Sequence, residues 1–241
     1  MGGSLGGSVG GCAVTGPVVV LIPPSACGAG YFARVRRVVA RHADVRVVEL
    51  PGHGRRFAEP LLTRARSAVA DVAAGLDGPV DVVYGESLGA YVALALVDAL
   101  PARARPSRLV VASNSPPSVR DPIDLTGVTS MATAAAVLRT MGGEVPDEAL
   151  SDPAVAARAY PLLRADLHLS QSFVDLTREL VVDVPVEVLA GTDDVALTGL
   201  ERWSRHTTAG CTLTRLRGGH LLSRADPDGV AATVLRTVPT P

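Results

Sequence analysis

A serine held between a strand and a helix is the feature of this sequence that most constrains its fold. Residues 80–84 form an apolar run that predicts a buried strand, and the chain then passes directly into Gly85-Glu86-Ser87-Leu88-Gly89 and an apolar helical stretch over 88–100. In so tight a turn, a side chain at either glycine would collide with the adjoining strand or helix. The pattern therefore predicts a strained turn that lifts the Ser87 hydroxyl to a helix N-terminus, where a developing anion is favoured.

The rest of the chain alternates between predicted strands and predicted helices. Apolar runs, mostly β-branched, predict strands at 17–23, 45–50, 80–84, 108–112, 186–190 and 212–216, and helical spacing predicts helices at 31–42, 62–76, 88–100 and 229–238. Such alternation predicts an α/β fold with a mostly parallel sheet and helices on both of its faces. We expect a single domain over 17–241, preceded by a flexible Gly/Ser-rich tail over 1–16.

One long segment interrupts this alternation. From about 121 to 180 no strand pattern is visible, and the sequence is helical and rich in Ala, Leu and Arg. We expect these residues, called the lid below, to form a helical insertion before the strand at 186–190. They should lie on the side of the sheet where ligands enter.

Composition argues against several classes of function. The 241 residues carry 23 basic residues, all arginine, against 24 acidic ones, and no basic stripe predicts a nucleic-acid or anionic-membrane partner. The three cysteines lack zinc or disulfide spacing, and we expect no metal or cofactor. The longest apolar stretch, 88–97, is too short to span a bilayer, and the N-terminus lacks a signal-peptide pattern. A monomeric cytoplasmic protein is the expectation.

A serine hydroxyl is a weak nucleophile without a base, and two of the five histidines compete for that role. His220 follows the predicted strand at 212–216 in a loop that contains Gly218 and Gly219, which lets it approach Ser87. His206 lies in a polar helical segment, and we expect it to face solvent. His220 is therefore the predicted base.

The third member of such a triad is a carboxylate that orients the histidine. It should follow the strand at 186–190, where Asp193 and Asp194 are adjacent. The order Ser87, Asp194, His220 is the order of nucleophile, acid and base in hydrolases with this kind of serine turn. We favour Asp194, with Asp193 as the close alternative or as a helix N-cap.

Two backbone N–H groups should stabilise the oxyanion that forms when the serine attacks. One is the N–H of Leu88, directly after the nucleophile. The other should come from the loop after the strand at 17–23, where prolines cannot donate, and Ser25 and Ala26 are the candidates. Cys27 in the same loop has no histidine or basic residue nearby in the sequence, so we do not predict it as a nucleophile.

Four stretches of this sequence together resemble one family. They are PGHGRR at 51–56 with Glu59-Pro60, the turn GESLGA, the segment MGGEVPDEAL followed by YPLLRADLHL in the lid, and the triad positions Asp194 and Gly219-His220. They resemble the free-standing type II thioesterases, which edit polyketide synthases and nonribosomal peptide synthetases and belong to the α/β-hydrolase superfamily. The resemblance runs from about 18 to 231.

The resemblance implies hydrolysis of acyl thioesters on the phosphopantetheine arm of acyl or peptidyl carrier proteins. The chain departs from the family pattern at the oxyanion loop, where Pro24-Ser25-Ala26-Cys27 replaces His-Ala-Gly-Gly, at Glu86 in place of histidine, and at His53 in place of arginine. These departures leave open the acyl chain and two alternatives on the same fold. One is a product-releasing thioesterase or cyclase, and the other is a small-molecule esterase.

Arginines in the matched stretches have simpler expected roles. We expect Arg164 and Asp166 to form an ion pair within the lid helix, because such pairs are commoner than substrate contacts. For Arg55 and Arg56 we expect a surface or loop-fixing role ahead of contact with a phosphate.

Overall fold

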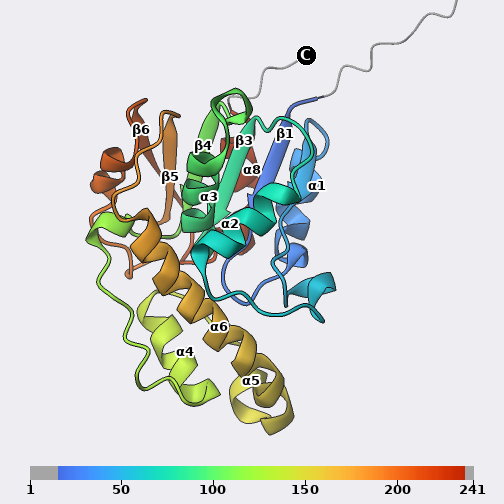
Figure 1. The fold of residues 1–241 in the computed structure, drawn as a ribbon, viewed down its shortest axis with the longest axis vertical. Helices are drawn as coiled ribbons and strands as arrows, with labels where there is room; N and C mark the ends of the chain where they lie inside the picture. Colours follow the sequence, from blue (N-terminus) through green and yellow to red (C-terminus); the bar gives the residue numbers. More distant parts are fainter. Residues whose placement is uncertain (1–15, 237–241) are drawn as a thin grey trace, which may run out of the picture.

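The structure, a computed structural model, describes residues 16–236, so the predicted flexible tail lies outside the described residues except for Gly16. A six-stranded sheet forms its centre, in the order β2-β1-β3-β4-β5-β6, and every neighbouring pair is parallel (Figure 1). The strands are β1 Val18–Ile22, β2 Asp44–Val47, β3 Val82–Glu86, β4 Arg108–Ala112, β5 Val186–Gly191 and β6 Cys211–Leu216. The α/β class and the parallel sheet predicted from the alternation are thus confirmed.

The parallel register brings the ends of the strands to one edge. Ile22 of β1 pairs with Gly85 of β3, and Glu86 of β3 pairs with Ala112 of β4. The loops that follow β1, β3, β5 and β6 therefore open on the same side of the sheet, which is where open parallel sheets bind ligands.

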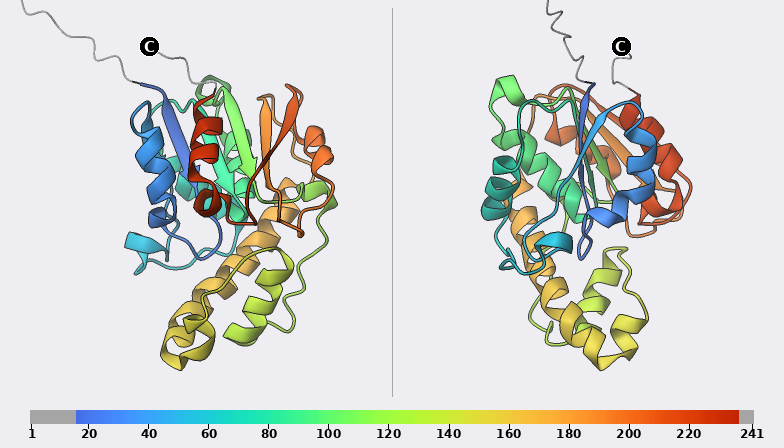
Figure 2. Two further views of the ribbon diagram at one scale, coloured as in Figure 1. Left: turned by 180° about the vertical axis from the view of Figure 1, so that it is seen from behind. Right: turned by 90° about the vertical axis from the view of Figure 1, so that its right-hand side faces the viewer.

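Helices cover both faces of this sheet (Figure 2). Helices α1 and α8 pack on one face, and α2, α3 and the C-terminal half of α6 pack on the other. Every residue of α3 from Leu88 to Val97 is buried, since this helix lies between the sheet and two other helices. The helices are α1 Ala33–Val39, α2 Ala65–Ala74, α3 Leu88–Ala99, α4 Met131–Thr140, α5 Glu148–Ser151, α6 Pro153–Thr177, α7 Leu222–Ala225 and α8 Pro227–Leu235.

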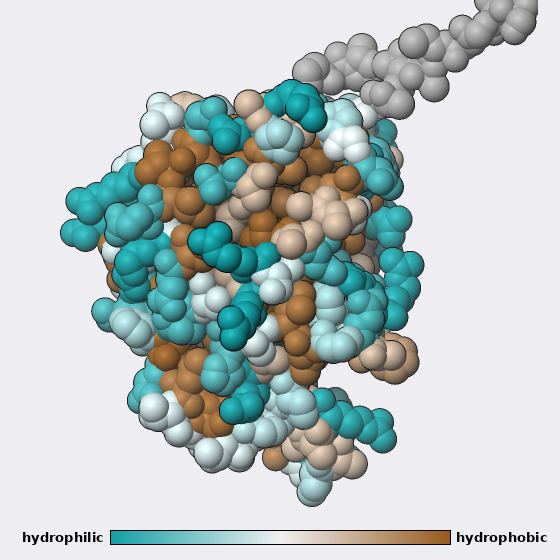
Figure 3. All heavy atoms as spheres, in the orientation of Figure 1, coloured by the Kyte–Doolittle hydropathy of each residue, from teal (hydrophilic) through white to brown (hydrophobic). Residues whose placement is uncertain are grey.

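The lid segment holds α4, α5 and α6, which extend from the body at the bottom of Figure 1. Local signals start its helices: Ser130 forms a capping box with Thr133 at α4, and the Asp152 carboxylate accepts from the first backbone N–H groups of α6. Helix α6 contains Pro161 in its interior. Apolar atoms reach the surface over α4, framed by hydrophilic ones (Figure 3).

Lid and body share α6 but have separate cores. The lid core joins α4, α5 and the middle of α6, whereas the C-terminal half of α6 packs into the core of the body through Leu169, Phe173 and Val174. The lid core consists of Val128, Met131, Ala134, Leu138, Ala149, Leu163 and Leu167. Helix α6 is therefore one element with two packing partners.

Element boundaries differ from the sequence prediction mainly at the ends. The strand expected at 45–50 ends at Val47, shortly before the turn at Pro51 and Gly52. The first helix starts with a 3₁₀ turn over Ala29–Phe32, and α7 was not predicted at all. Across the described residues, no helix is long and apolar enough to cross a membrane.

Candidate active site

Ser87 lies at the strand-to-helix turn in a strained backbone conformation. It directly follows β3, serves as the N-cap of α3, and has φ 55° and ψ −120°. A residue with a side chain adopts positive φ only where its surroundings impose it. Here the Ser87 N–H donates to the Ala112 carbonyl at 2.9 Å, and Asn114 Nδ2 donates to the Ser87 carbonyl at 2.8 Å. The turn therefore holds the hydroxyl at the first turn of α3.

The flanking glycines are required by close backbone contacts. A Cβ atom at Gly85 would lie 2.0 Å from the Gly89 carbonyl oxygen, and one at Gly89 would lie 2.2 Å from the Ile22 carbonyl oxygen. No backbone can yield by that much without losing the turn. The second contact also places the start of the oxyanion loop, after β1, against the first turn of α3.

His220 connects Ser87 to Asp194. Its Nε2 lies 2.9 Å from Ser87 Oγ, and its Nδ1 lies 2.8 Å from Asp194 Oδ2. The side chains of His220 and Asp194 are only 4% and 2% exposed, whereas Asp193 is exposed to solvent. When Nδ1–H donates to the carboxylate, Nε2 is left unprotonated and can accept the serine proton. This geometry suits nucleophilic acyl transfer.

The oxyanion loop offers one free donor from the two predicted candidates. The Ala26 N–H donates to Asp166 Oδ2 at 2.6 Å, so it is not available to a substrate. Within residues 16–236, the N–H groups of Ser25 and Leu88 have no hydrogen-bond partner. The structure thus removes Ala26 from the pair of candidates and leaves Ser25 with Leu88.

Comparison with known proteins places this arrangement in a family. The thioesterase domain model matches residues 17–238, nearly the whole chain. The chain belongs to the thioesterase family. A curated relative, the linear gramicidin dehydrogenase LgrE of Brevibacillus parabrevis, is 22% identical to this thioesterase over 87% of the chain and 83% of its own length.

Solved structures share the fold over most of their length. RedJ, a thioesterase of the prodiginine pathway in Streptomyces coelicolor, is 26% identical in its complex with a polyethylene glycol, covering 92% of this chain and 91% of its own, with a TM-score of 0.77. BorB, a type II thioesterase of the borrelidin cluster, is 24% identical over 94% of both chains, with a TM-score of 0.78. The predicted α/β-hydrolase class is confirmed.

His53, from the PGHG loop, reaches the oxyanion loop through Asp166 of α6. Its Nε2 lies 3.1 Å from Asp166 Oδ2 and its Nδ1 lies 3.2 Å from the Pro51 carbonyl oxygen. When Asp166 is ionised both partners are acceptors, and a doubly protonated His53 ring donates to each of them. Burial alone would lower the pKa of His53, but the hydrogen bond and charge of Asp166 outweigh it and raise that pKa.

The ion pair expected between Arg164 and Asp166 does not form. Arg164 lies on the exposed side of α6 while Asp166 is buried and pairs with His53. Residues two apart on a helix face different directions, which is why the pair cannot close. The loop-fixing role expected for Arg56 is observed, since its guanidinium binds Glu59 and Asp71 and caps the Glu49 carbonyl.

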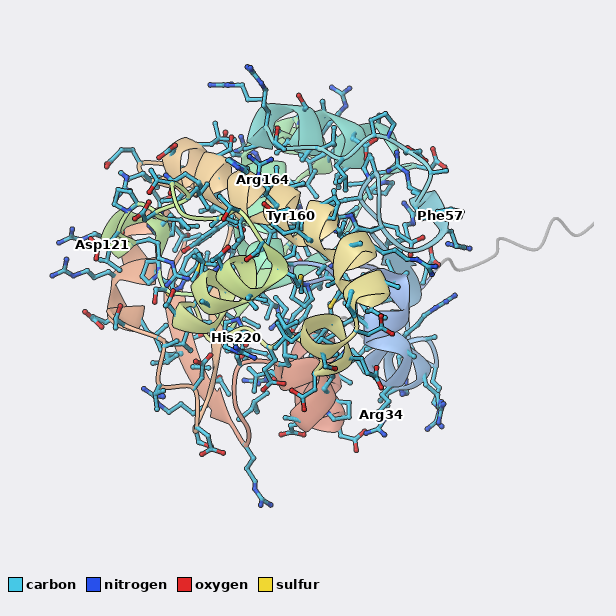
Figure 4. All side chains as sticks on the ribbon, turned by 90° about the horizontal axis from the view of Figure 1, so that it is seen from below. Arg34, Phe57, Asp121, Tyr160, Arg164 and His220 are labelled. Carbon is cyan, nitrogen blue, oxygen red and sulfur yellow. The ribbon has the colours of Figure 1, made fainter. Side chains whose placement is uncertain are left out.

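The lid comes into contact with the triad at Gly142, which follows α4. Its φ is 86°, and a Cβ atom there would lie 2.5 Å from His220 Nδ1 and 3.1 Å from Asp194 Oδ1. Viewed from the lid end, His220 lies beside α4, whereas Phe57 and Asp121 lie at the rim of the molecule (Figure 4). Gly142 therefore covers the histidine at a distance that only a glycine permits.

An apolar cavity of about 270 Å³ lies between the lid helices and reaches the oxyanion loop at Ala26. Two carboxylates, Glu144 and Glu148, contribute to its lining. Its other lining residues are Met131, Leu138, Val145, Pro146, Ala149, Val155, Ala159, Leu162 and Leu163. The cavity offers an apolar enclosure for a hydrocarbon chain at the oxyanion loop.

Glu86, next to the nucleophile, is a fully buried carboxylate at the position where the family pattern has histidine. Its oxygens accept from the hydroxyls of Tyr31, Tyr84 and Ser223, at 2.6, 2.8 and 2.5 Å. Burial raises the pKa of Glu86, and these hydrogen bonds oppose the rise. The network connects β3, which leads into Ser87, to α7, which follows His220.

His206 and Cys27, which the sequence analysis considered and did not favour, take no part in the triad. His206 was expected in solvent, but it is buried against Trp203, with Nδ1 bound to the Leu180 carbonyl and Nε2 to the Ser118 hydroxyl. Burial lowers the pKa of His206, so the ring is neutral. Burial also raises the pKa of the Cys27 thiol to about 11, which makes it a poor nucleophile. Within residues 16–236 no His, Cys, Asp and Glu cluster could hold a metal ion.

Proposed function

We propose that this thioesterase hydrolyses acyl thioesters carried on the phosphopantetheine arm of acyl or peptidyl carrier proteins. Its task would be to remove stalled or misprimed chains from polyketide or nonribosomal peptide assembly. The observation that carries the proposal is the Ser87–His220–Asp194 hydrogen-bond chain beside an apolar lid cavity. The similarity to RedJ and to BorB, a type II thioesterase, supports this class of substrate.

In the proposed mechanism, Ser87 Oγ attacks the thioester carbonyl as His220 Nε2 takes its proton. The N–H groups of Leu88 and Ser25 stabilise the tetrahedral oxyanion, and Asp194 stabilises the imidazolium. Collapse breaks the carbon–sulfur bond, and His220 returns the proton to the thiolate of the arm. Water then attacks the acyl-Ser87 ester with His220 as base, and the free acid leaves. The proposed reaction calls on no group beyond these residues and water.

The size of the lid cavity favours editing over release of a finished product. Pockets that enclose drug-sized ligands measure roughly 300–1,000 Å³, and the cavity at about 270 Å³ falls just below that range. A short acyl group fills such a space, whereas a complete polyketide or peptide does not fit in it.

The test is a panel of carrier proteins loaded with acyl groups of increasing length, with loss of each acyl group followed by mass spectrometry. We expect fastest removal of short chains, and no removal above background by Ser87→Ala. A nitrophenyl ester of the same acyl group serves as the comparison for simple esterase activity.

Two results would contradict the proposal. Hydrolysis of a single long product, with short chains untouched, would assign the protein to product release. A nitrophenyl ester turned over faster than any carrier-bound thioester would assign it to the esterases.

A further inference from the structure

Asp166 and His53 take no part in the hydrolytic steps above, yet they contact the oxyanion loop directly. Asp166 is 1% exposed, and its Oδ2 accepts from both the Ala26 N–H and the His53 ring. The three residues come from different parts of the chain: the loop after β1, the PGHG loop and the lid helix α6. Their contact therefore joins three segments at the residue that follows Ser25.

The oxyanion loop needs such support because its turn is unfavourable for its sequence. Cys27 N–H donates to the Pro24 carbonyl at 3.2 Å, which closes a turn with Ala26 at its third position. Ala26 has a φ of 58°, a conformation that favours glycine. The hydrogen bond to Asp166 fixes the orientation of the Ala26 N–H.

In its ionised form the Asp166 carboxylate accepts from the Ala26 N–H and from the His53 ring with the same oxygen. A buried carboxylate without a cation loses its charge or its place, because burial penalises the charged form. His53 supplies that cation, since its two nitrogens both face acceptors. The family pattern has an arginine in place of His53. An arginine is always charged, whereas a histidine carries its charge only below its pKa.

We propose that the His53–Asp166 ion pair is the positioning device of the oxyanion hole. Asp166 fixes the Ala26 N–H, so the preceding N–H of Ser25 is left directed toward the substrate oxyanion, and His53 keeps Asp166 charged and in place. Both are positioning residues, since neither touches the reacting atoms. The inference rests on the proposed use of the Ser25 N–H in thioester hydrolysis.

A consequence is that turnover depends on the charge of His53. A general base acts in its unprotonated form, so the base of the triad does not account for a loss of rate at alkaline pH. Loss of the His53 proton leaves Asp166 unpaired and produces an alkaline side. The other titratable and charged groups at these two loops are Cys27, whose pKa is about 11, Glu86, which accepts from three hydroxyls, and Arg224, which acts on Cys27. In the PGHG loop and beside it, Glu49 pairs with Arg55, and Arg56 pairs with Asp71 and Glu59.

The test compares His53→Gln, His53→Arg and Asp166→Asn with the wild-type protein. Single-turnover acylation of Ser87 by a short-chain acyl pantetheine thioester is measured from pH 6 to 10. Arg164→Gln, on the exposed side of the same helix, is the matched control. Thermal unfolding of each variant reports its folding, and NMR titration of the His53 ring in the wild-type protein gives its pKa without any substitution.

We expect His53→Gln and Asp166→Asn to acylate about 10²-fold more slowly at pH 7, close to the loss of one oxyanion donor, with KM little changed. His53→Arg should keep the rate and lose the alkaline side of the profile, and Arg164→Gln should match the wild-type protein. The wild-type alkaline midpoint should coincide with the NMR pKa of His53.

The inference is overturned if His53→Gln and Asp166→Asn stay within twofold of the wild-type rate. It is also overturned if the wild-type rate is constant across the His53 titration. A wild-type protein that leaves every acyl pantetheine and every acyl-carrier protein intact would instead refute the proposed function. The two failures are therefore distinguishable.

Discussion

Gly142→Ala should disable the active site from the lid side while leaving every catalytic group in the chain. The added Cβ would lie 2.5 Å from His220 Nδ1, about 0.9 Å inside the 3.4 Å at which ordinary contact begins. His220 is held at both ring nitrogens, so either the ring shifts against Ser87 or the lid loop moves away. A misplacement of about 1 Å costs roughly 10²-fold in rate, which is about 2.7 kcal/mol of transition-state stabilisation.

The substitution also places alanine at a φ of 86°, which destabilises the fold by roughly 1 kcal/mol whatever the surroundings. Gly78→Ala is the matched control, because Gly78 has a φ of 77° and open space around its missing Cβ. Gly142→Ala should lose at least as much stability in urea unfolding as Gly78→Ala, because it adds a clash to the same backbone cost. Only Gly142→Ala should lose about 10²-fold in kcat/KM for a short acyl-carrier thioester. If the two variants have kcat/KM values within twofold of each other, the lid does not touch His220 during catalysis.

Four further predictions concern single side chains. Asp194→Asn should lower kcat by about 10⁴-fold by stabilising the wrong tautomer of the histidine, while Asp193→Asn leaves kcat unchanged; equal losses would contradict the assignment. Alkylation of Cys27 by iodoacetamide should rise about tenfold per pH unit up to about pH 11, and a plateau near pH 9 in peptide mass spectrometry would show an ordinary thiol. His206 has a lowered pKa in the folded protein, so the unfolded chain binds the proton at a higher pH than the folded one. The free energy of unfolding should therefore fall as the pH drops below about 6.5. Urea unfolding of His206→Gln should show a weaker fall between about pH 6.5 and 5. Glu86→Gln points an amide donor at hydroxyl donors and should cost about 1–3 kcal/mol of unfolding free energy, so an unchanged urea midpoint would exclude the hydrogen-bond network.

The parts of this molecule that the sequence predicts are those encoded by neighbouring residues. The serine turn and the strand ends are local patterns. The parallel register then brings His220 and Asp194 to Ser87, although they lie 133 and 107 positions further along the chain. Sequence spacing cannot decide between Asp193 and Asp194, because adjacent residues occupy almost the same position and differ in the direction of their side chains. That direction is set by the loop after β5 and not by spacing.

The Asp166 contacts could not be predicted from spacing, since its partners lie 140 and 113 positions away. Yet a signal was present. Leu163, Asp166, Leu167 and Ser170 recur at helical spacing and are all buried, so Asp166 stands on the inward stripe of α6. A carboxylate on such a stripe requires a partner from another segment. The same reasoning applies to His206, which lies three positions after buried Trp203 within one 3₁₀ segment.

Pro161 gives α6 a mechanical role beyond packing. Proline has no N–H to donate to the Ala157 carbonyl, so the helix bends most easily at this point. Asp166 lies on the far side of that hinge, toward the half of α6 that is anchored in the body. The lid core extends across this point, because Leu163 and Leu167 lie on the body side of Pro161 and pack with α4 and α5. The oxyanion loop thus takes its support from the half of α6 that the body core holds, and the missing hydrogen bond at Pro161 separates Asp166 from the outer end of the lid helix.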